Sequence, residues 1–287
     1  QLGVRVALNV PGVAFGGDQL WLRINTATAA HEGIDAGSLQ GGGTNAYLEV
    51  AGQRLVGSFW IKQSGPAAAK ATTIVATGVS LFVGDPGGPG EADDRGLRLT
   101  DGSATILLTS AGLAAKISVN VALVGLPVTV GAGAPVTVEI NTTPAAVKRA
   151  DLGLDLPAGS FLRVQLGTAA QPFVLAVAGQ SLSGVFSFEK VPTAGADKRL
   201  GTTDDVISLK VAATQVGLFL GADQGTPDTG DDVGLRLSDG AALLLITPQG
   251  LAGTISASAS LRLGAGIGGL TVNVAVAVNQ LRGADGS

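Results

Sequence analysis

The chain has 287 residues, a formal net charge of −4 and an isoelectric point near 5.0, and it contains neither cysteine nor methionine. Phosphate binding needs clustered lysine and arginine, so this acidic balance argues against a nucleic-acid partner. Without cysteine, disulfides and thiol chemistry are excluded. No apolar stretch reaches the ~20 residues that a membrane-spanning helix needs, and the length suggests about two domains.

The composition predicts strands rather than helices. Glycine contributes 44 of the 287 residues, well above the usual ~7%. Apolar residues make up 46% of the chain but aromatic residues only 4%, so valine, leucine, isoleucine and alanine must form the core. Frequent glycine together with β-branched residues fits strands joined by tight turns. We therefore expect an all-β protein without helices of normal length.

Alternating apolar and polar residues mark the expected strands in chain order. A glycine-rich loop is predicted at residues 31–45, and a hairpin over residues 46–61 that turns at Gly52-Gln53. Further turns are predicted at Asp101-Gly102 and Asp239-Gly240, because Asp-Gly is a favoured hairpin dipeptide. Turns are also predicted at residues 110–112 and 248–250. The remaining strands are expected at residues 4–8, 19–26, 72–83, 97–99, 104–109, 113–124 and 136–141, with counterparts at 206–220, 235–237, 242–247, 251–263 and 270–279.

The chain repeats itself. The acidic segment 84–102 returns as 221–240, in which the matched residues from Asp85 and Asp223 to Asp101 and Asp239 keep a constant offset of 138. The hairpin 46–61 returns as 173–188 at an offset of 127. The second copy therefore contains two insertions of 11, one near residues 194–205 and one between Asn141 and Gly179. Asn25, Asn141 and Asn279 end similar runs. The positions of these asparagines predict the tail of a preceding repeat, or terminal strands, at 1–24, one module at 25–141 and another at 142–287. Such a chain would be an excerpt of a longer array or a subunit completed by a neighbouring chain.

Each acidic loop is a candidate calcium site. Ca²⁺ takes six to eight oxygen ligands in flexible geometry, and several crowded carboxylates repel one another unless a cation is present. Neither loop has the EF-hand spacing, and a solvated surface turn is the alternative. The candidate ligands are Asp85, Glu91, Asp93 and Asp94 in the first loop and Asp223, Asp228, Asp231 and Asp232 in the second.

The sequence argues against an enzyme. His31 is the single histidine and lies in a glycine-rich loop. No nucleophile motif accompanies it, so a Ser-His-Asp arrangement is not indicated. The adjacent carboxylates Asp93-Asp94 would point to opposite faces of a strand, which is a weak basis for glycoside hydrolysis. The glycine-rich residues 264–269 have no following helix and are interpreted as a turn.

Three segments carry a resemblance to a known kind of protein: residues 155–164, residues 177–188 and residues 234–253. They resemble tandem β-repeat modules of giant bacterial calcium-dependent surface and extracellular proteins. The resemblance implies secretion to the cell surface or outside the cell, calcium stabilisation and a structural or adhesive role. The first copy departs from this pattern, because residues 31–45 replace the Pro157-Ala158-Gly159 region.

We therefore expect an elongated all-β fold of tandem modules, mostly antiparallel sandwich or meander, with a continuous β-solenoid as the alternative. The favoured function is a structural subunit of an extracellular fibre or matrix. Copies of the chain would join head to tail through terminal strands. The alternative is an adhesin that binds surface carbohydrate through Trp21, Tyr47 or Trp60, although core packing is the commoner role for such residues.

Overall fold

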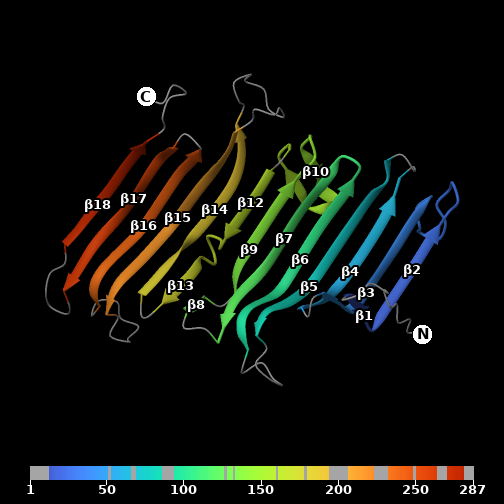
Figure 1. The fold of residues 1–287 in the computed structure, drawn as a ribbon, viewed down its shortest axis with the longest axis horizontal. Coiled ribbons are helices and arrows are strands. Elements are labelled where there is room, and N and C mark those ends of the chain that lie inside the picture. The colour runs from blue at the N-terminus through green and yellow to red at the C-terminus, as the bar shows by residue number, and fades with distance from the viewer. Residues whose placement is uncertain are drawn as a thin grey trace. The chain divides into compact units, whose positions relative to one another are not determined.

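The structure is a computed structural model that describes residues 13–50, 53–65, 69–85, 94–125, 128–131, 133–159, 161–177, 180–193, 206–222, 232–247, 250–263 and 270–280. Nearly all of these residues form antiparallel strands, and no α-helix occurs among them (Figure 1). The expected all-β antiparallel meander is confirmed. The chain divides into two compact units. Unit 1 holds residues 1–124 and 137–161, and unit 2 holds residues 125–136 and 162–287.

Unit 1 is a sheet with the strand order β1-β3-β4-β5-β6-β7-β9, in which β2 also pairs with β3. The hydroxyls of Ser118 and Thr137 lie 3.1 Å apart and show how β9 lies beside β7. The strands are β1 (Val13–Gly16), β2 (Gln19–Asn25), β3 (Ser38–Val50), β4 (Gln53–Ser64), β5 (Ala71–Asp85), β6 (Arg95–Thr109), β7 (Gly112–Val124) and β9 (Ala134–Asn141), of which unit 1 holds the residues from Thr137 onward.

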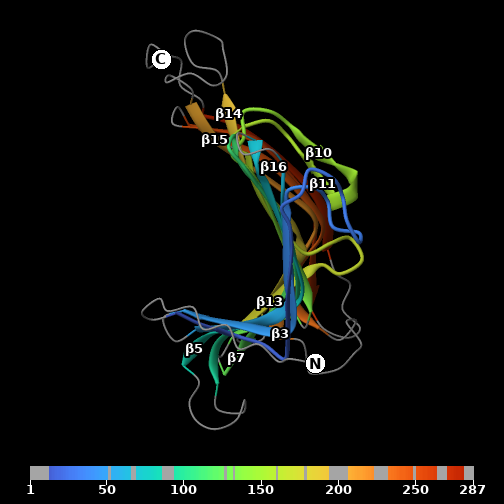
Figure 2. The ribbon, with the colours of Figure 1, turned by 90° about the vertical axis from the view of Figure 1, so that its right-hand side faces the viewer.

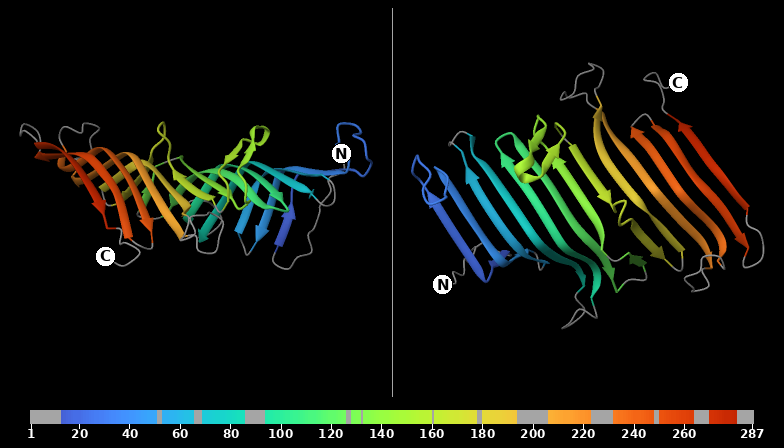
Figure 3. Two further views of the ribbon diagram at one scale, coloured as in Figure 1. Left: turned by 90° about the horizontal axis from the view of Figure 1, so that it is seen from above. Right: turned by 180° about the vertical axis from the view of Figure 1, so that it is seen from behind.

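Unit 2 repeats this plan with the order β12-β14-β15-β16-β17-β18, while β13 pairs with both β14 and β8. Figure 3 shows β14 to β18 following one another as the colour passes from yellow to red. The strands are β8 (Val128–Val130), β12 (Phe161–Leu166), β13 (Phe173–Val177), β14 (Gln180–Thr193), β15 (Val206–Ala222), β16 (Val233–Thr247), β17 (Gly250–Leu263) and β18 (Leu270–Asn279).

The hairpins expected at four of the turns are confirmed by the strand register. Val50 pairs with Gln53 in unit 1, and Val177 pairs with Gln180 in unit 2. Thr109 pairs with Gly112, and Thr247 with Gly250, as their sequences predict. In both of the latter hairpins the threonine Oγ1 donates a 3.3 Å hydrogen bond to the glycine carbonyl oxygen.

The expectation for Asp101-Gly102 and Asp239-Gly240 was wrong, because both dipeptides lie inside long strands. They form β-bulges at which the register shifts between Thr100 and Ser103 of β6, and between Ser238 and Ala241 of β16. Both aspartates adopt a positive φ of 52°. Each glycine sits against a valine of the neighbouring strand: a Cβ on Gly102 would lie 2.9 Å from Val79, and one on Gly240 only 2.7 Å from Val216. The Asp-Gly signal thus marks a bend, not a turn.

The bulges line up from strand to strand. In unit 1 the register also shifts within the pairings β3–β4, β4–β5 and β5–β6. In unit 2 it shifts within β14–β15 and β15–β16. Because a bulge bends its strand, a row of bulges bends the whole sheet, and the long strands are visibly curved in Figure 2. We call the two sides of each sheet the apolar face and the polar face.

The register sorts side chains cleanly between these faces, because neighbouring residues of a strand point to opposite sides. On β17 the apolar face carries Leu251, Ile255, Ala257, Ala259 and Leu261, and the polar face carries Thr254, Ser256, Ser258 and Ser260. On β7 the apolar face carries Leu113, Ile117, Val119 and Val121, and the polar face carries Lys116, Ser118 and Asn120.

A segment after β9 covers part of the polar side of unit 1. It contains β10 (Val147–Arg149), the 3₁₀ turn η3 (Ala150–Leu152) and β11 (Leu154–Leu156), which lie on the convex side of the strands in Figure 2. Leu154 and Leu156 of this segment, together with Phe161 at the start of β12, pack against Leu107 and Ala114 of the sheet and form a core cluster. Covering these two residues gives the segment its hydrophobic anchorage.

Asn141 closes this covering segment. Its side chain is fully buried; Nδ2 donates to the carbonyl oxygens of Ala145 (2.9 Å) and Pro157 (2.6 Å), and Oδ1 accepts from the Thr143 amide (2.9 Å). Asn25 makes the corresponding three bonds after β2: to Ala29 (2.9 Å), to Ile34 (3.0 Å) and from Ala27 (2.9 Å). The echo of asparagines in the sequence is therefore a repeated loop-closing device.

The strand register also locates one insertion of the second copy. The offset between equivalent residues is 116 for Asn25 and Asn141, 123 for Leu39 and Leu162, and 127 for Phe59 and Phe186. The first increase falls in the segment after Asn141. The second falls between β12 and β13, which together take the place of β3 beside the hairpin partner. The other insertion, near residues 194–205, lies outside the described residues.

Candidate functional sites

Two of the eight candidate calcium ligands have described side chains, and both are ion-paired with arginine. Arg98 Nη2 donates a 2.7 Å hydrogen bond to Asp94 Oδ2, and Arg236 Nη2 donates a 2.5 Å bond to Asp232 Oδ2. Both carboxylates are buried, with only 9% and 2% of each residue exposed. In both copies the arginine lies four residues after the aspartate on the same strand end. A buried carboxylate needs a partner of opposite charge, and in both copies the arginine supplies it.

The environment of Arg236 shows how this pair is fixed. Its guanidinium lies 5.0 Å from the centroid of the Phe219 ring, a cation–π arrangement. Phe219 is the cross-strand partner of Arg236, and Phe82 is the partner of Arg98 in unit 1. Beside Asp94, Arg98 and Phe82 lies a shallow pocket of about 230 Å³ that is also lined by Ser80 and Thr100.

The other calcium candidates are not placed by side chain. Asp85 ends β5, and its backbone pairs with Arg95. Glu91, Asp93, Asp223, Asp228 and Asp231 lie outside the described residues. Among the residues that the structure does describe, no group of three histidine, aspartate or glutamate side chains gathers as a metal centre would. The calcium hypothesis therefore rests on the sequence of the two loops.

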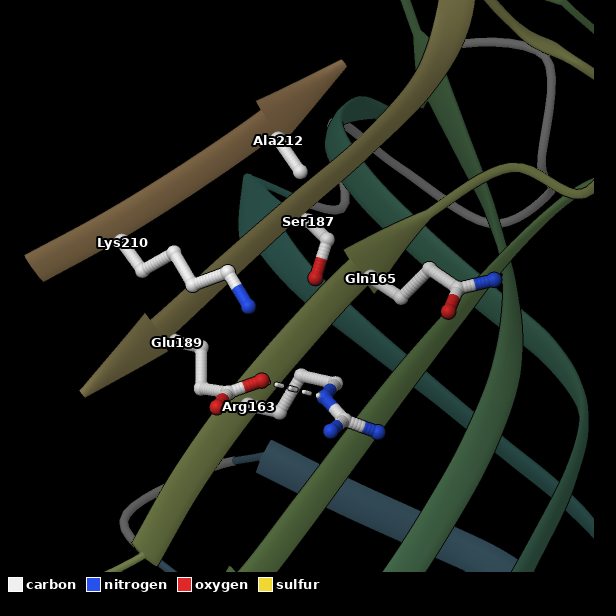
Figure 4. A pocket seen from close by; sticks show the side chains of 6 residues that line it. All are labelled: Arg163, Gln165, Ser187, Glu189, Lys210 and Ala212. Carbon is white, nitrogen blue, oxygen red and sulfur yellow. Dashed lines mark hydrogen bonds and ion pairs between the residues drawn. The ribbon is translucent and has the colours of Figure 1, made fainter. Parts of the chain in front are cut away.

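A second polar pocket, of about 240 Å³, lies on the polar face of unit 2 (Figure 4). Arg163 of β12, Glu189 of β14 and Lys210 of β15 form one cross-strand row, and Arg163 Nε donates a 3.0 Å hydrogen bond to Glu189 Oε2. Gln165, Ser187 and Ala212 form the next row. Sequence reasoning did not single out this site, although polar residues at every second position of residues 163–165 and 187–189 signal it. The row is an ordinary cross-strand charge arrangement that stabilises a sheet.

The aromatic candidates line the first strands of unit 1. Trp21 and Trp60 flank Gly42 in a cross-strand row, and a Cβ on Gly42 would come within 2.8 Å of the Trp21 ring. Trp21 remains 40% exposed, and the Arg23 guanidinium lies 5.5 Å from its ring centroid. The Tyr47 ring lies over the backbone of Gly16. These aromatics therefore cover glycines of the sheet, which stabilises glycine-rich strands.

His31 and Arg149 each lie beside a carboxylate. The side chain of His31 is highly exposed, and its Nε2 lies 3.8 Å from Glu32 Oε1. Arg149 binds Asp151 through two hydrogen bonds of 2.8 and 2.6 Å. This guanidinium lowers the pKa of the Asp151 carboxyl, and the carboxylate in turn raises the pKa of Arg149. Neither group is arranged with a nucleophile.

The fold and these sites define a class: a duplicated, antiparallel β-meander with repeated buried Asp–Arg pairs. Searches of family models, of curated proteins and of solved structures find no match to this chain. Within the described residues, no helix is long and apolar enough to cross a membrane.

Proposed function

We propose that this chain is a structural repeat protein of an extracellular fibre, matrix or cell surface, assembled head to tail and without catalytic activity. The observation that carries the proposal is the duplication of the strand plan, which includes the bulges and the Asp–Arg pairs. Catalysis needs only one set of catalytic residues, whereas structural scaffolds are commonly built by repeating one unit. Units that stack by repeating one supersecondary plan are the hallmark of such scaffolds.

The edges of the sheets support assembly. Within the described residues, β18 pairs only with β17, and β2 pairs only with β3. Every residue of β18 except Val278 is exposed, including Leu270, Val272, Val274 and Val276. An exposed strand edge is a template for addition of another strand. Contacts between different surfaces of successive copies produce filaments when they do not close.

Proline substitution tests strand addition at β18. Successive backbone N–H groups of β18 point alternately towards β17 and towards the open edge. One of the two variants Val274→Pro and Ala275→Pro therefore removes a donor to β17, and the other removes a donor at the open edge. We expect one of them to keep the melting temperature and abolish filaments in electron micrographs. Ser256→Pro, at the β17 residue that pairs with Ala275, should instead unfold the sheet locally. Wild-type protein that stays monomeric at every concentration contradicts head-to-tail assembly.

Calcium is a separate part of the proposal and has its own test. If Ca²⁺ binds only the folded loops, a chelator should lower the melting temperature by several degrees, since a native-state ligand stabilises by mass action. Asp93→Asn with Asp231→Asn should remove this response while leaving the Asp94 and Asp232 ion pairs intact. Identical melting curves with calcium and with chelator would exclude calcium stabilisation but would leave the strand-addition test unaffected.

A further inference from the structure

Unit 2 presents an uncovered apolar face. Among the described residues of this unit, all exposed large apolar side chains except Leu243 lie on that face by register. They come from β12, β15, β16, β17 and β18: Leu162, Ile207, Leu209, Leu220, Val233, Leu235, Ile246, Ile255, Leu261, Leu263, Leu270, Val272, Val274 and Val276. A contiguous apolar patch across adjoining strands marks an interaction surface.

One charged side chain interrupts this face outside the bulges. Lys190 of β14 lies between Leu162 of β12 and Leu209 of β15 in the cross-strand row. Phe188 and Phe186 follow it on the same face of β14, beside Val211 and Ala213. Among the described residues the side-chain ammonium of Lys190 makes no ion pair or hydrogen bond. The carboxylate of Glu189, on the other face, is bound by Arg163. A half-buried lysine between leucines offers a positive charge at one end of an apolar surface.

The curvature of the strands selects what can cover this face. The bulges at residues 213–218 and 238–241 bend β15 and β16, and the long strands are curved in Figures 2 and 3, so the apolar face is a curved surface. Sheets that pack face to face do so about 10 Å apart with aligned surfaces. Two copies of one curved face do not match each other in shape and leave voids between them, which well-packed proteins avoid. Flexible alkyl chains can fill a curved surface.

We propose that the apolar face of unit 2 binds a long-chain fatty acid, with its acyl chain along Phe188 and Phe186 and its carboxylate at Lys190. From Lys190 to Leu182 the strand covers roughly 26 Å at about 3.3 Å per residue. One leaflet's acyl chain spans about half of the ~30 Å hydrocarbon core of a bilayer. The face is therefore long enough for a full chain, and the charge lies at the end where an amphiphile's head belongs. This inference does not depend on head-to-tail assembly.

The test uses spin-labelled stearate and the full chain, with binding measured by broadening of the electron paramagnetic resonance spectrum. We expect saturable binding to the wild type. Leu209→Glu places a carboxylate beside Lys190 and should abolish binding. Lys210→Glu is the matched control: it is the next residue, is also exposed and lies on the polar face, so binding should be unchanged. Both positions are exposed, and circular dichroism melting verifies that both variants fold.

A separate variant tests whether Lys190 binds the carboxylate of the fatty acid. Lys190→Gln should weaken stearate binding about two- to fivefold, the range expected for a solvent-accessible ion pair, and should leave the methyl ester of the same probe unaffected. Equal loss for acid and ester would overturn the role of Lys190. Absence of saturable binding, or equal loss in Leu209→Glu and Lys210→Glu, would overturn the proposal. So would a lipid-free dimer that Leu209→Glu dissociates, because a second copy would then cover the face.

Discussion

Asp101 and Asp239 occupy the same left-handed bulge position, 138 residues apart, each with a φ of 52° and each followed by a glycine that contacts a valine of the next strand. Left-handed backbone costs an ordinary L-residue about 1–2 kcal/mol, and aspartate and asparagine tolerate it best. These two positions, one in β6 and one in β16, therefore contribute to the bend of their sheets through a backbone angle that few residue types tolerate.

Asp239→Val should lower the free energy of unfolding by about 1–2 kcal/mol, because a β-branched residue is poorly accommodated at positive φ. Asp239→Asn should change it by less than about 0.5 kcal/mol. Urea denaturation gives both values. Ser238→Val, one residue earlier in extended backbone, is the control and should be nearly neutral; an equal loss there would show that the backbone angle is not the cause.

Asn141→Ala should destabilise unit 1 by about 2–3 kcal/mol, because the Pro157 carbonyl oxygen loses its buried donor and the Thr143 amide loses its acceptor. The Ala145 carbonyl oxygen would keep only the Thr143 hydroxyl as a donor. Loss of the closing bonds should also loosen the covering segment. Hydrogen exchange at the amides of Thr143 and Gly159 is the measurement, and both should exchange faster. Asn120→Ala removes one long 3.3 Å bond on the exposed surface, so faster exchange in that variant as well would argue against a specific role for Asn141.

Arg236→Leu should destabilise unit 2 by about 3 kcal/mol, because removing one partner of a buried pair leaves a charge without compensation. Asp232 is the charge concerned, with 2% of the residue exposed. Adding Asp232→Leu should restore most of the loss, and a double-mutant cycle by thermal unfolding measures the coupling. Lys148→Leu, at an exposed lysine, serves as the reference. Additive effects of the two substitutions would contradict a coupled pair.

The Asp151 carboxyl should titrate at a lower pH than an ordinary aspartate, because Arg149 holds its ionised form. A depressed pKa contributes stability above the unfolded-state pKa, and that contribution disappears as the pH falls through the folded-state value. Asp151 is fully exposed, so its titration should be visible locally without a measurable change in global stability. Carboxyl ¹³C chemical shifts against pH give the midpoint, which Arg149→Gln should move back towards the ordinary value.

Much of the fold could be predicted from the sequence. Alternation at period two located most of the long strands, and the constant offsets located the duplication. The glycine-rich loop expected at residues 31–45 was wrong in its second half, because β3 begins at Ser38 and its glycines pair with β2 and β4. The sequence signal at Asp101-Gly102 correctly indicates positive φ, but turns and bulges both need it. Only the pairing of β6 with β5 and β7 on both sides of the dipeptide distinguishes them.

The candidate sites were less accessible to sequence reasoning. The carboxylates of Asp94 and Asp232 were grouped with their acidic neighbours because they are adjacent in the loops. Their arginine partners lie four residues later, beyond the start of a strand, where spacing alone does not establish contact. Arg163, Glu189 and Lys210 lie on three separate strands. Their row can be recognised only when the register of these strands is known.

In unit 2 the loop at residues 167–172 separates β12 from β13, whereas in unit 1 the equivalent strand β3 is continuous. The loop lies at the position where β3 has its bulge between Gly43 and Ala46. Both halves nevertheless keep their pairing with β14. The bend is thus a position at which extra residues can be accommodated without breaking the ladder. A peptide tag or binding epitope grafted at Asn45 should therefore be displayed by unit 1 with the sheet intact, which makes the bend a natural insertion point for engineering the scaffold.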